Sequence, residues 1–323
     1  YLDIGRAEGA EVLTGGDPLK REDLFDLIAY AGARGLGVSV APSATPLLTA
    51  EALRRMKDSG VEAISLSLDA PDAAAHDAVR GVPGTFERTL EAADVARRIG
   101  LPLQVNTLVC AQTADGLPAM LELVQRLGAP RWSLFFLVAV GRGQVLEPLT
   151  AQRAEELLGW LAARRGQAMA RGLVITTTEA PQLRRIVEER AAAGDRAIAA
   201  GAAQTHPGQT QGRHPAVAHG AGIRDGNGVL FINHRGDICP SGFLELAAGN
   251  LRQDALADTY REAPLFKALR EPDAFGGRCG VCPYRWPCGG SRARAYAASG
   301  DILAEDPLCA YRPEGDGRGP RAS

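Results

Sequence analysis

Between residues 9 and 165, short apolar runs alternate with longer stretches whose apolar residues recur at helical spacing. The alternation occurs five times, which predicts five consecutive βα units and therefore an α/β fold. Because the apolar runs are nearly continuous, we expect a parallel sheet that is buried on both faces. The predicted strands are 10–14, 36–41, 62–68, 103–109 and 132–140, and the predicted helices are 22–34, 50–59, 85–99, 117–127 and 151–164.

The chain has 323 residues, which suffices for about two domains with a sizeable core. With 36 basic and 38 acidic residues, its net charge of −2 excludes the strongly basic balance of a general nucleic-acid binder. The longest largely apolar run, residues 132–140, is much shorter than the roughly twenty residues of a membrane-spanning helix. No signal peptide is visible, so we expect a cytoplasmic protein that binds neither nucleic acid nor membrane.

The composition changes after about residue 190, where a further predicted strand and helix end. Residues 191–227 are rich in Ala, Gly, Gln and His, which is typical of a flexible linker. A predicted hairpin of 229–233 and 237–239 follows, and then two short helices and a cysteine-rich segment. We therefore expect a first domain at 1–190, a linker at 191–227, and a second domain at 228–323 with a disordered tail.

Four of the six cysteines lie within 31 residues near the end of the chain, which is typical of a metal site in a cytosolic protein. Neighbouring glycines would let the backbone wrap closely around a metal centre. Four thiolates suit either a tetrahedral zinc ion or an iron–sulfur cluster, and the softness of sulfur does not separate the two. The alternative is four buried structural cysteines without metal. The candidate ligands are Cys279, Cys282, Cys288 and Cys309, whereas Cys110 and Cys239 stand apart.

A second candidate site is Gly15-Gly16-Asp17-Pro18, at the end of the first predicted strand, where βα folds carry their ligand-binding loops. The glycines let a ligand approach the backbone, and the Asp17 carboxylate can hold a cationic group such as an ammonium. An equally good interpretation is a sharp turn in which Asp17 caps the next helix. Polar residues at the ends of the next strands would line the same edge of the sheet; they are Ser43, Ser67, Asp69, Asn106 and Thr107.

Two further groups of polar residues allow more than one interpretation. His206, His214 and His219 lie in the predicted linker, and their spacing fits no helix face, so a metal site there is the weaker interpretation. Arg292 and Arg294 would either cap the cysteine segment or bind an anionic substrate. The default interpretation for both arginines is a solvated helix face.

The combination of these motifs resembles the radical S-adenosylmethionine (SAM) superfamily. Residues 13–19, LTGGDPL, resemble its GGEP motif with Asp in place of Glu. Residues 64–69 and 80–86 resemble its fourth barrel strand and the helix that follows. The cysteine spacing resembles the SPASM or twitch extension, which holds an auxiliary iron–sulfur cluster. Residues 239–243, 248–250 and 288–296 are similar to the branch that forms haem and haem d1, next to a branch of peptide-modifying enzymes.

The resemblance implies a partial (β/α)6 radical SAM barrel with a small C-terminal α+β iron–sulfur domain. SAM and a reduced [4Fe–4S] cluster would generate a 5′-deoxyadenosyl radical that abstracts hydrogen from a tetrapyrrole or peptide substrate. A flavodoxin or ferredoxin would donate the electron. Gly15, Gly16 and Asp17, with Pro18 in the same motif, would hold the SAM amino group. Ser43, Ser67, Asp69 and Asn106 would face its ribose or carboxylate, and Cys279, Cys282, Cys288 and Cys309 would ligate one auxiliary [4Fe–4S] cluster.

The sequence departs from the family pattern in two places. The Cys-x3-Cys-x2-Cys loop that holds the SAM-cleaving cluster lies before the GGEP motif in the family, but only fourteen residues precede Gly15 and none is Cys. We interpret the chain as lacking its first βα unit and the ligands of that cluster. Ser291 stands where the tetrapyrrole branch often has Cys, which supports a single auxiliary cluster. Two other hypotheses remain: a zinc-stabilised binding module without redox chemistry, and an inactive fragment.

Overall fold

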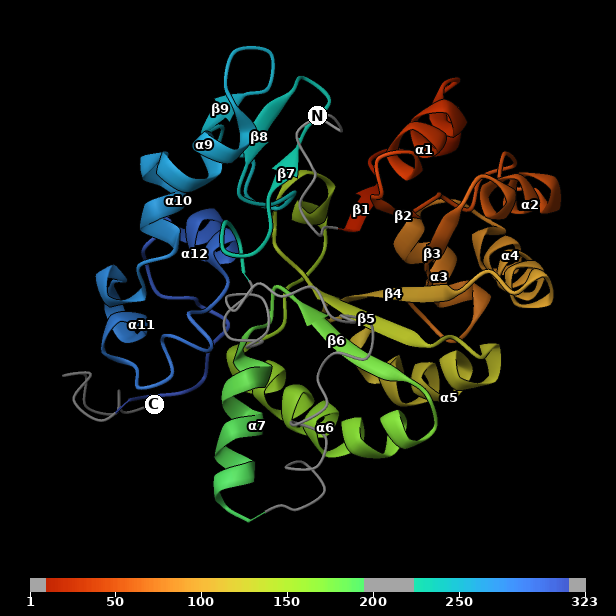
Figure 1. Cartoon of the computed structure of the whole chain (residues 1–323). Helices are drawn as coiled ribbons and strands as arrows, with labels where there is room; N and C mark the ends of the chain where they lie inside the picture. The colour runs from red at the N-terminus through yellow and green to blue at the C-terminus, as the bar shows by residue number, and fades with distance from the viewer. Residues whose placement is uncertain (1–9, 195–223, 314–323) are drawn as a thin grey trace. The chain divides into compact units, whose positions relative to one another are not determined.

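The computed structural model describes residues 10–194 and 224–313 (Figure 1). Its largest feature is a six-stranded parallel sheet with the strand order β1-β2-β3-β4-β5-β6, so strands that follow one another in sequence are neighbours in the sheet. This order confirms the predicted α/β fold. The strands are β1 Ala10–Leu13, β2 Gly37–Val40, β3 Val61–Ser67, β4 Leu103–Val109, β5 Arg131–Phe136 and β6 Val174–Thr178.

Helices connect consecutive strands, as the alternation predicts. Thr49 accepts a hydrogen bond from the backbone N–H of Ala52 and so caps α2, and Gly100, at φ +68°, ends α4. One helix that we did not predict, α3, has its own signals, because Asp72 caps its start and Gly81 ends it at φ +68°. The helices are α1 Leu24–Gly32, α2 Ala50–Asp58, α3 Ala73–Arg80, α4 Thr85–Ile99, α5 Leu117–Leu127, α6 Ala151–Ala170 and α7 Gln182–Ala192.

The burial of the strands differs from the prediction. Along β4, residues alternate between buried and half-buried: Val105 and Thr107 are buried, whereas Gln104 and Asn106 are half-buried. Strand β3 shows a similar alternation after Ala63. The expected burial on both faces therefore does not hold for β3 and β4, whereas in β5 three successive residues, 132–134, are buried.

Neighbouring strands of the sheet are joined by buried side-chain hydrogen bonds. The Trp132 indole Nε1–H of β5 donates to Thr107 Oγ1 of β4 at 2.8 Å. The Thr107 hydroxyl in turn donates to the carbonyl oxygen of Leu68 at 2.6 Å. Trp132 and Thr107 are both fully buried. Their polar groups cannot reach water, and these hydrogen bonds give each of them a partner inside the protein. Thr107, a candidate site residue, thus has a structural role.

The described residues form two compact units. The first consists of 10–135 and 168–176, and the second of 136–167, 177–194 and 224–313. The predicted linker at 191–227, with its three histidines, lies mostly outside the described residues, as does the end of the tail. The domain boundaries that the sequence suggests, at 190 and 228, stay a prediction.

The C-terminal part of the second unit confirms the predicted hairpin. Strands β7 Phe231–Ile232 and β8 Asp237–Cys239 pair in antiparallel fashion, and β9 Gly249–Asn250 adds a third strand. Four helices follow, and the last is capped by the Ser291 hydroxyl, which accepts from the Arg294 N–H at 3.0 Å. They are α9 Leu256–Glu262, α10 Pro264–Leu269, α11 Gly277–Val281 and α12 Arg292–Ser299.

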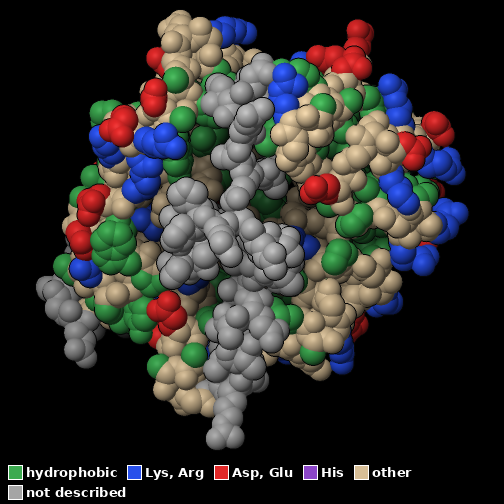
Figure 2. Space-filling view, viewed as in Figure 1, with side chains coloured by type: hydrophobic (Ala, Val, Ile, Leu, Met, Phe, Trp, Pro, Cys, Tyr) green, Lys and Arg blue, Asp and Glu red, His purple; other side chains and the backbone are tan. Residues whose placement is uncertain are grey.

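The surface of the described residues agrees with the near-neutral charge. On the face shown in Figure 2, basic and acidic side chains are interspersed. Within 10–194 and 224–313, no helix combines the length and the apolar character needed to cross a bilayer.

Candidate metal and cofactor sites

The glycine turn after β1 leaves its backbone accessible. Gly15 and Gly16 have φ values of +94° and +45°, a region that side-chain-bearing residues rarely adopt. A Cβ atom added to either glycine would meet no other atom within 4 Å, so the space beside the backbone is open. The Ser43 hydroxyl, from the loop after β2, donates to the Gly16 carbonyl oxygen at 2.9 Å. Two of the predicted site segments are therefore joined directly.

Asp17 makes three contacts within the protein. Its Oδ1 accepts from the backbone N–H of Leu19 at 3.2 Å and of Ser43 at 3.4 Å, and its Oδ2 accepts from Thr45 Oγ1 at 2.7 Å. Asp17 thus caps the short 3-10 helix Pro18–Lys20, whose first residue, Pro18, is buried. The capping interpretation of Asp17 is correct. A carboxylate can accept about four hydrogen bonds, so these contacts leave room for a further donor. The role of Asp17 toward SAM therefore stays a prediction.

Ser67, the last residue of β3, lies beside Asn106 in the middle of β4, because the register pairs one with the other. Both are half-buried on the polar side of the sheet. The Asn106 side-chain oxygen accepts from Gln104 Nε2 at 2.7 Å. The structure therefore brings these two predicted residues together, and Gln104 is a neighbour that the sequence did not single out.

Asp69 differs from the other predicted site residues, because it is fully buried. Its Oδ2 lies 2.6 Å from Arg80 Nε, and its Oδ1 accepts from the Leu108 N–H at 2.8 Å. Its own backbone N–H donates to His76 Nδ1 at 3.0 Å. These contacts give Asp69 a structural role, in which it fixes α3 and β4 to the end of β3.

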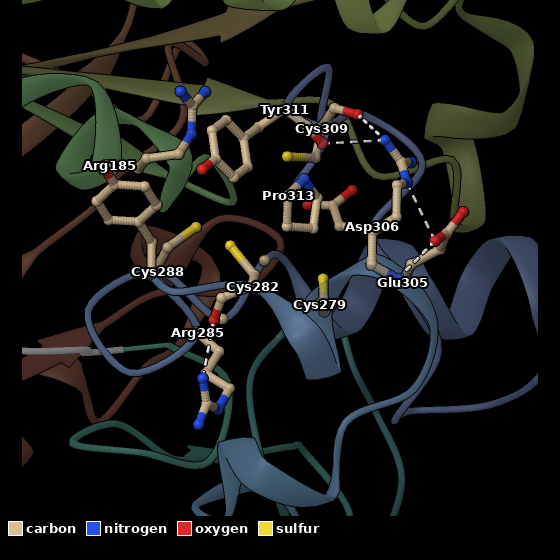
Figure 3. Close-up of a pocket in the computed structure, with 14 residues that line it drawn as sticks. Arg185, Cys279, Cys282, Arg285, Cys288, Glu305, Asp306, Cys309, Tyr311 and Pro313 are labelled. Carbon is tan, nitrogen blue, oxygen red and sulfur yellow. Dashed lines mark hydrogen bonds and ion pairs between the residues drawn. The ribbon is translucent and has the colours of Figure 1, made fainter. Parts of the chain in front are cut away.

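The four clustered cysteines line a single cavity that is partly open to solvent. Figure 3 shows their sulfur atoms directed toward the same space. All four are free thiols. Among the residues that the structure describes, no three His, Cys, Asp or Glu side chains are gathered closely enough to hold one metal ion. The cavity is also lined by Arg185, Arg278, Arg285, Tyr284 and Tyr311.

Burial makes three of these thiols poor acids without a cation. It raises the pKa of Cys288 to about 12 and that of Cys309 to about 11, and it also raises the pKa of Cys282. A metal centre would reverse this effect, because a coordinating thiol is deprotonated outright. The chemistry of the donor set, four thiols around one cavity, therefore fits a thiolate-ligated metal group.

Two glycines shape the wall of this cavity. Gly289 and Gly290 both have φ of +67°. A Cβ atom on Gly290 would lie 2.7 Å from Arg292 Nη2 and 2.8 Å from Asp306 Cβ, so any side chain there would clash. The glycines at these positions thus permit the close approach of α12 to the cysteine segment, as their sequence position indicated.

The two arginines of α12 correct a prediction. Arg292 is 0 % exposed and Arg294 is 7 % exposed, so neither lies on a solvated helix face. Arg294 pairs with Asp306 at 3.1 Å. It also donates to the carbonyl oxygens of Phe136, Leu137 and Glu179, at 3.4, 3.2 and 2.6 Å. The solvated interpretation failed because the first turn of α12 is enclosed by residues distant in sequence.

Two other charged residues near the cavity, both arginines, were missed. Arg185 of α7 is 2 % exposed and is paired with Glu155 at 2.5 Å and Glu189 at 2.7 Å. Arg224 is also buried, and burial together with the neighbouring charge of Arg292 lowers its pKa to about 10. No local pattern marks these residues, because their roles depend on tertiary contacts. Cys110 and Cys239, by contrast, are buried away from the cavity lining.

The chain is similar to known proteins over nearly its whole length. Residues 8–124 match the radical SAM superfamily. The chain is 38 % identical over 304 residues to the AdoMet-dependent heme synthase of Nitratidesulfovibrio vulgaris, covering 94 % of this chain and 79 % of that protein. It is 35 % identical over 302 residues to the AdoMet-dependent heme synthase of Methanosarcina barkeri, covering 94 % and 82 %. The crystal structure of Streptococcus suis SuiB has the same fold, with a TM-score of 0.67 at 15 % identity, covering 94 % of this chain and 67 % of that chain.

Proposed function

Because the chain belongs to the radical SAM superfamily and is an enzyme of that superfamily, we propose that it modifies a tetrapyrrole substrate by radical chemistry. The observation that carries this proposal is the similarity to heme synthases over 94 % of the chain, which includes both candidate sites. SAM and iron–sulfur clusters supply the radical and redox chemistry when bound, and the protein supplies binding and orientation.

The SAM site that we propose lies at the carboxyl ends of β1 to β4. The open backbone at Gly15 and Gly16 supports it, and Asp17 provides a carboxylate beside that backbone for the SAM amino group. Pro18 begins the 3-10 helix that fixes this turn. Ser43, Ser67 and Asn106 would contact the ribose or the carboxylate of SAM. Asp69 lies outside the proposed site, because it is fully buried and held by Arg80 and Leu108.

We further propose one auxiliary [4Fe–4S] cluster held by Cys279, Cys282, Cys288 and Cys309. The shared cavity of the four thiols supports this assignment. So does the hydrogen bond from Arg292 to Cys279 Sγ, since a cluster bound by four thiolates carries net negative charge. The six free cysteines suit the cytoplasm, where thiols stay reduced.

A small electron-transfer protein such as a flavodoxin or ferredoxin would reduce the enzyme. Val281 and Trp286 flank Cys282 in sequence and are 55 % and 50 % exposed, so both apolar side chains are available to such a partner.

Iron and zinc analysis tests the auxiliary cluster. Protein reconstituted anaerobically should carry about four irons per chain at this site, with the brown colour of an iron–sulfur protein. Cys282→Ser should lose most of this iron, whereas Cys239→Ser, a buried cysteine outside the cavity, should keep it. Stoichiometric zinc after anaerobic purification would instead identify a zinc-stabilised binding module.

A titration tests the substrate class. Iron-coproporphyrin added to the reconstituted protein should shift its Soret absorbance and saturate at one equivalent per chain. Failure to saturate would remove the tetrapyrrole proposal and leave the peptide alternative.

A further inference from the structure

Arg292 has an unusual environment for a charged residue. It is 0 % exposed and lies at the first position of α12. Its Nη1 donates to the carbonyl oxygens of Ile302 at 3.2 Å and Ala304 at 2.7 Å. Its guanidinium stacks on the Phe275 ring, 4.4 Å from the ring centroid. These contacts hold the guanidinium in one position.

The remaining contact of this guanidinium points to the cysteine cavity. Arg292 Nη2 donates to Cys279 Sγ at 3.5 Å. Gly290 makes this approach possible, because a Cβ atom at that position would lie 2.7 Å from Arg292 Nη2. The backbone next to the cysteine segment is thus shaped to admit a charged donor to a sulfur atom.

The positive charge of Arg292 has no acidic counterpart. Within 10–194 and 224–313, no carboxylate lies within ion-pair distance of Arg292, whereas Arg185, Arg278 and Arg294 all have one. Arg292 Nε also has no hydrogen-bond partner in this part of the chain. Arg224, another buried cation, faces the same Phe275 ring at 5.5 Å. A buried charge costs several kcal/mol unless an opposite charge compensates it, so this region requires an anion.

We propose that Arg292 is a positioning residue that raises the reduction potential of the auxiliary cluster, through its hydrogen bond to the Cys279 sulfur and its uncompensated charge. This inference rests on the proposed cluster at the four cysteines. One electron from a donor makes the cluster more negative, and a nearby cation that donates to a ligating sulfur stabilises that reduced state. The thiolate-bound cluster is, in turn, the counter-charge that Arg292 lacks.

The test is a redox titration of the reconstituted protein with dithionite, monitored by electron paramagnetic resonance. The signal that disappears in Cys282→Ser, which lacks one of the four thiols, is assigned to this site. In Arg292→Gln we expect the ratio of reduced to oxidised cluster at a fixed potential to fall about tenfold, or about 59 mV for one electron. Arg292→Lys, which keeps the charge but not the planar group, should shift in the same direction by less.

The double variant Arg278→Gln/Glu305→Gln is the matched control. Arg278 and Glu305 both line the cavity and form an ion pair at 3.1 Å, so replacing both removes a neutral pair and should shift the potential little. A potential unchanged in Arg292→Gln at full iron content would overturn the proposal. If Arg292→Gln loses its iron or does not fold, Arg292→Lys decides: a lowered potential supports the proposal and an unchanged one overturns it. Absence of iron from the wild type is a different result, because it rejects the cluster itself and the inference with it.

Discussion

Glu179 directly follows β6 and adopts φ +58°, the only positive φ of a non-glycine residue in the described ranges. Its carboxylate accepts from the Ser291 hydroxyl. The nearby Asp225 is 3 % exposed and accepts from the Ala293 N–H at 2.9 Å. Burial and repulsion by Asp225 raise the pKa of Glu179 to about 8, although Arg294 acts in the opposite direction. At neutral pH the folded protein therefore keeps a proton on this pair.

The retained proton predicts how stability depends on pH. The unfolded chain releases the Glu179 proton near pH 4.5, whereas the folded protein holds it to about pH 8, so this group reduces stability as the pH rises between those values. Glu179→Gln cannot ionise and should gain melting temperature relative to wild type, by a few degrees, between pH 5.5 and 8. Glu262→Gln is the control, because Lys267 lowers the pKa of Glu262 and its effect has the opposite sign. If the difference in melting temperature between wild type and Glu179→Gln stayed constant over this pH range, the raised pKa of Glu179 would be contradicted.

Asp17 gives the sharpest test of the proposed SAM site. Replacing Asp17 with Asn keeps the shape and removes the charge that the SAM amino group would meet. A hydrogen bond to a charged group contributes about 1.5–3 kcal/mol, so SAM affinity should fall by about one to two powers of ten in a direct titration. Thr45→Val, which removes a donor to Asp17 but leaves the carboxylate, should bind SAM more nearly as wild type. Equal affinities for wild type and Asp17→Asn would leave Asp17 with its capping role alone.

At the scale of elements, sequence patterns located the strands and helices well but not their surroundings. Helix α4, which ends at Gly100, and helix α5 agree with the prediction because their amphipathic pattern and terminal glycines are local signals. The expected burial on both faces was wrong for β4, because Thr107 is polar and yet buried and so hides the period-two alternation of that strand.

The candidate sites were predictable to a similar extent. Cys279 and Cys282 could be found from spacing, since ligands on one turn are close in sequence. The buried arginines could not be found, because Arg292 and Arg294 are two positions apart in a helix and would ordinarily not share a face. The ion pair of Asp69 could not be found either, because its partner Arg80 lies on a helix that we had not predicted.

The buried hydrogen bond between Trp132 of β5 and Thr107 of β4 predicts that removal of the Thr107 hydroxyl destabilises the protein. Thr107→Val removes the acceptor of the buried Trp132 indole N–H, which should lower the free energy of unfolding by about 1–3 kcal/mol. In the double variant with Trp132→Phe, the Thr107→Val change should cost less, because no indole donor is left without a partner. Thr176→Val is the control, since its 3.2 Å contact with Ser133 is only partly buried. Urea unfolding followed by circular dichroism measures the wild type, the two single variants, the double variant and the control, and strictly additive losses would argue against the coupling.

At the scale of the whole molecule, the two compact units should respond differently to metal. All four candidate ligands lie in the second unit, where a bound cluster would add binding free energy to folding. Chelation of the reconstituted protein should therefore raise amide hydrogen exchange in residues 277–311 and leave β2, β3 and β4 unchanged. In Cys282→Ser, amide hydrogen exchange in this segment should be the same with and without chelator. Equal changes in both units would show that their stabilities are not separable.

Arg294 donates to carbonyl groups that lie 115 to 158 positions earlier in the chain. Pairings across such distances form slowly, because the intervening chain must first be brought together. The ends of β5 and β6 must exist before this arginine has acceptors, so the cysteine segment reaches its final arrangement late in folding. Iron insertion is then expected to be a closing step in the maturation of the enzyme. A cell short of iron would accumulate molecules with a finished sheet and an unfinished C-terminal segment, and that segment is where proteases would cut first.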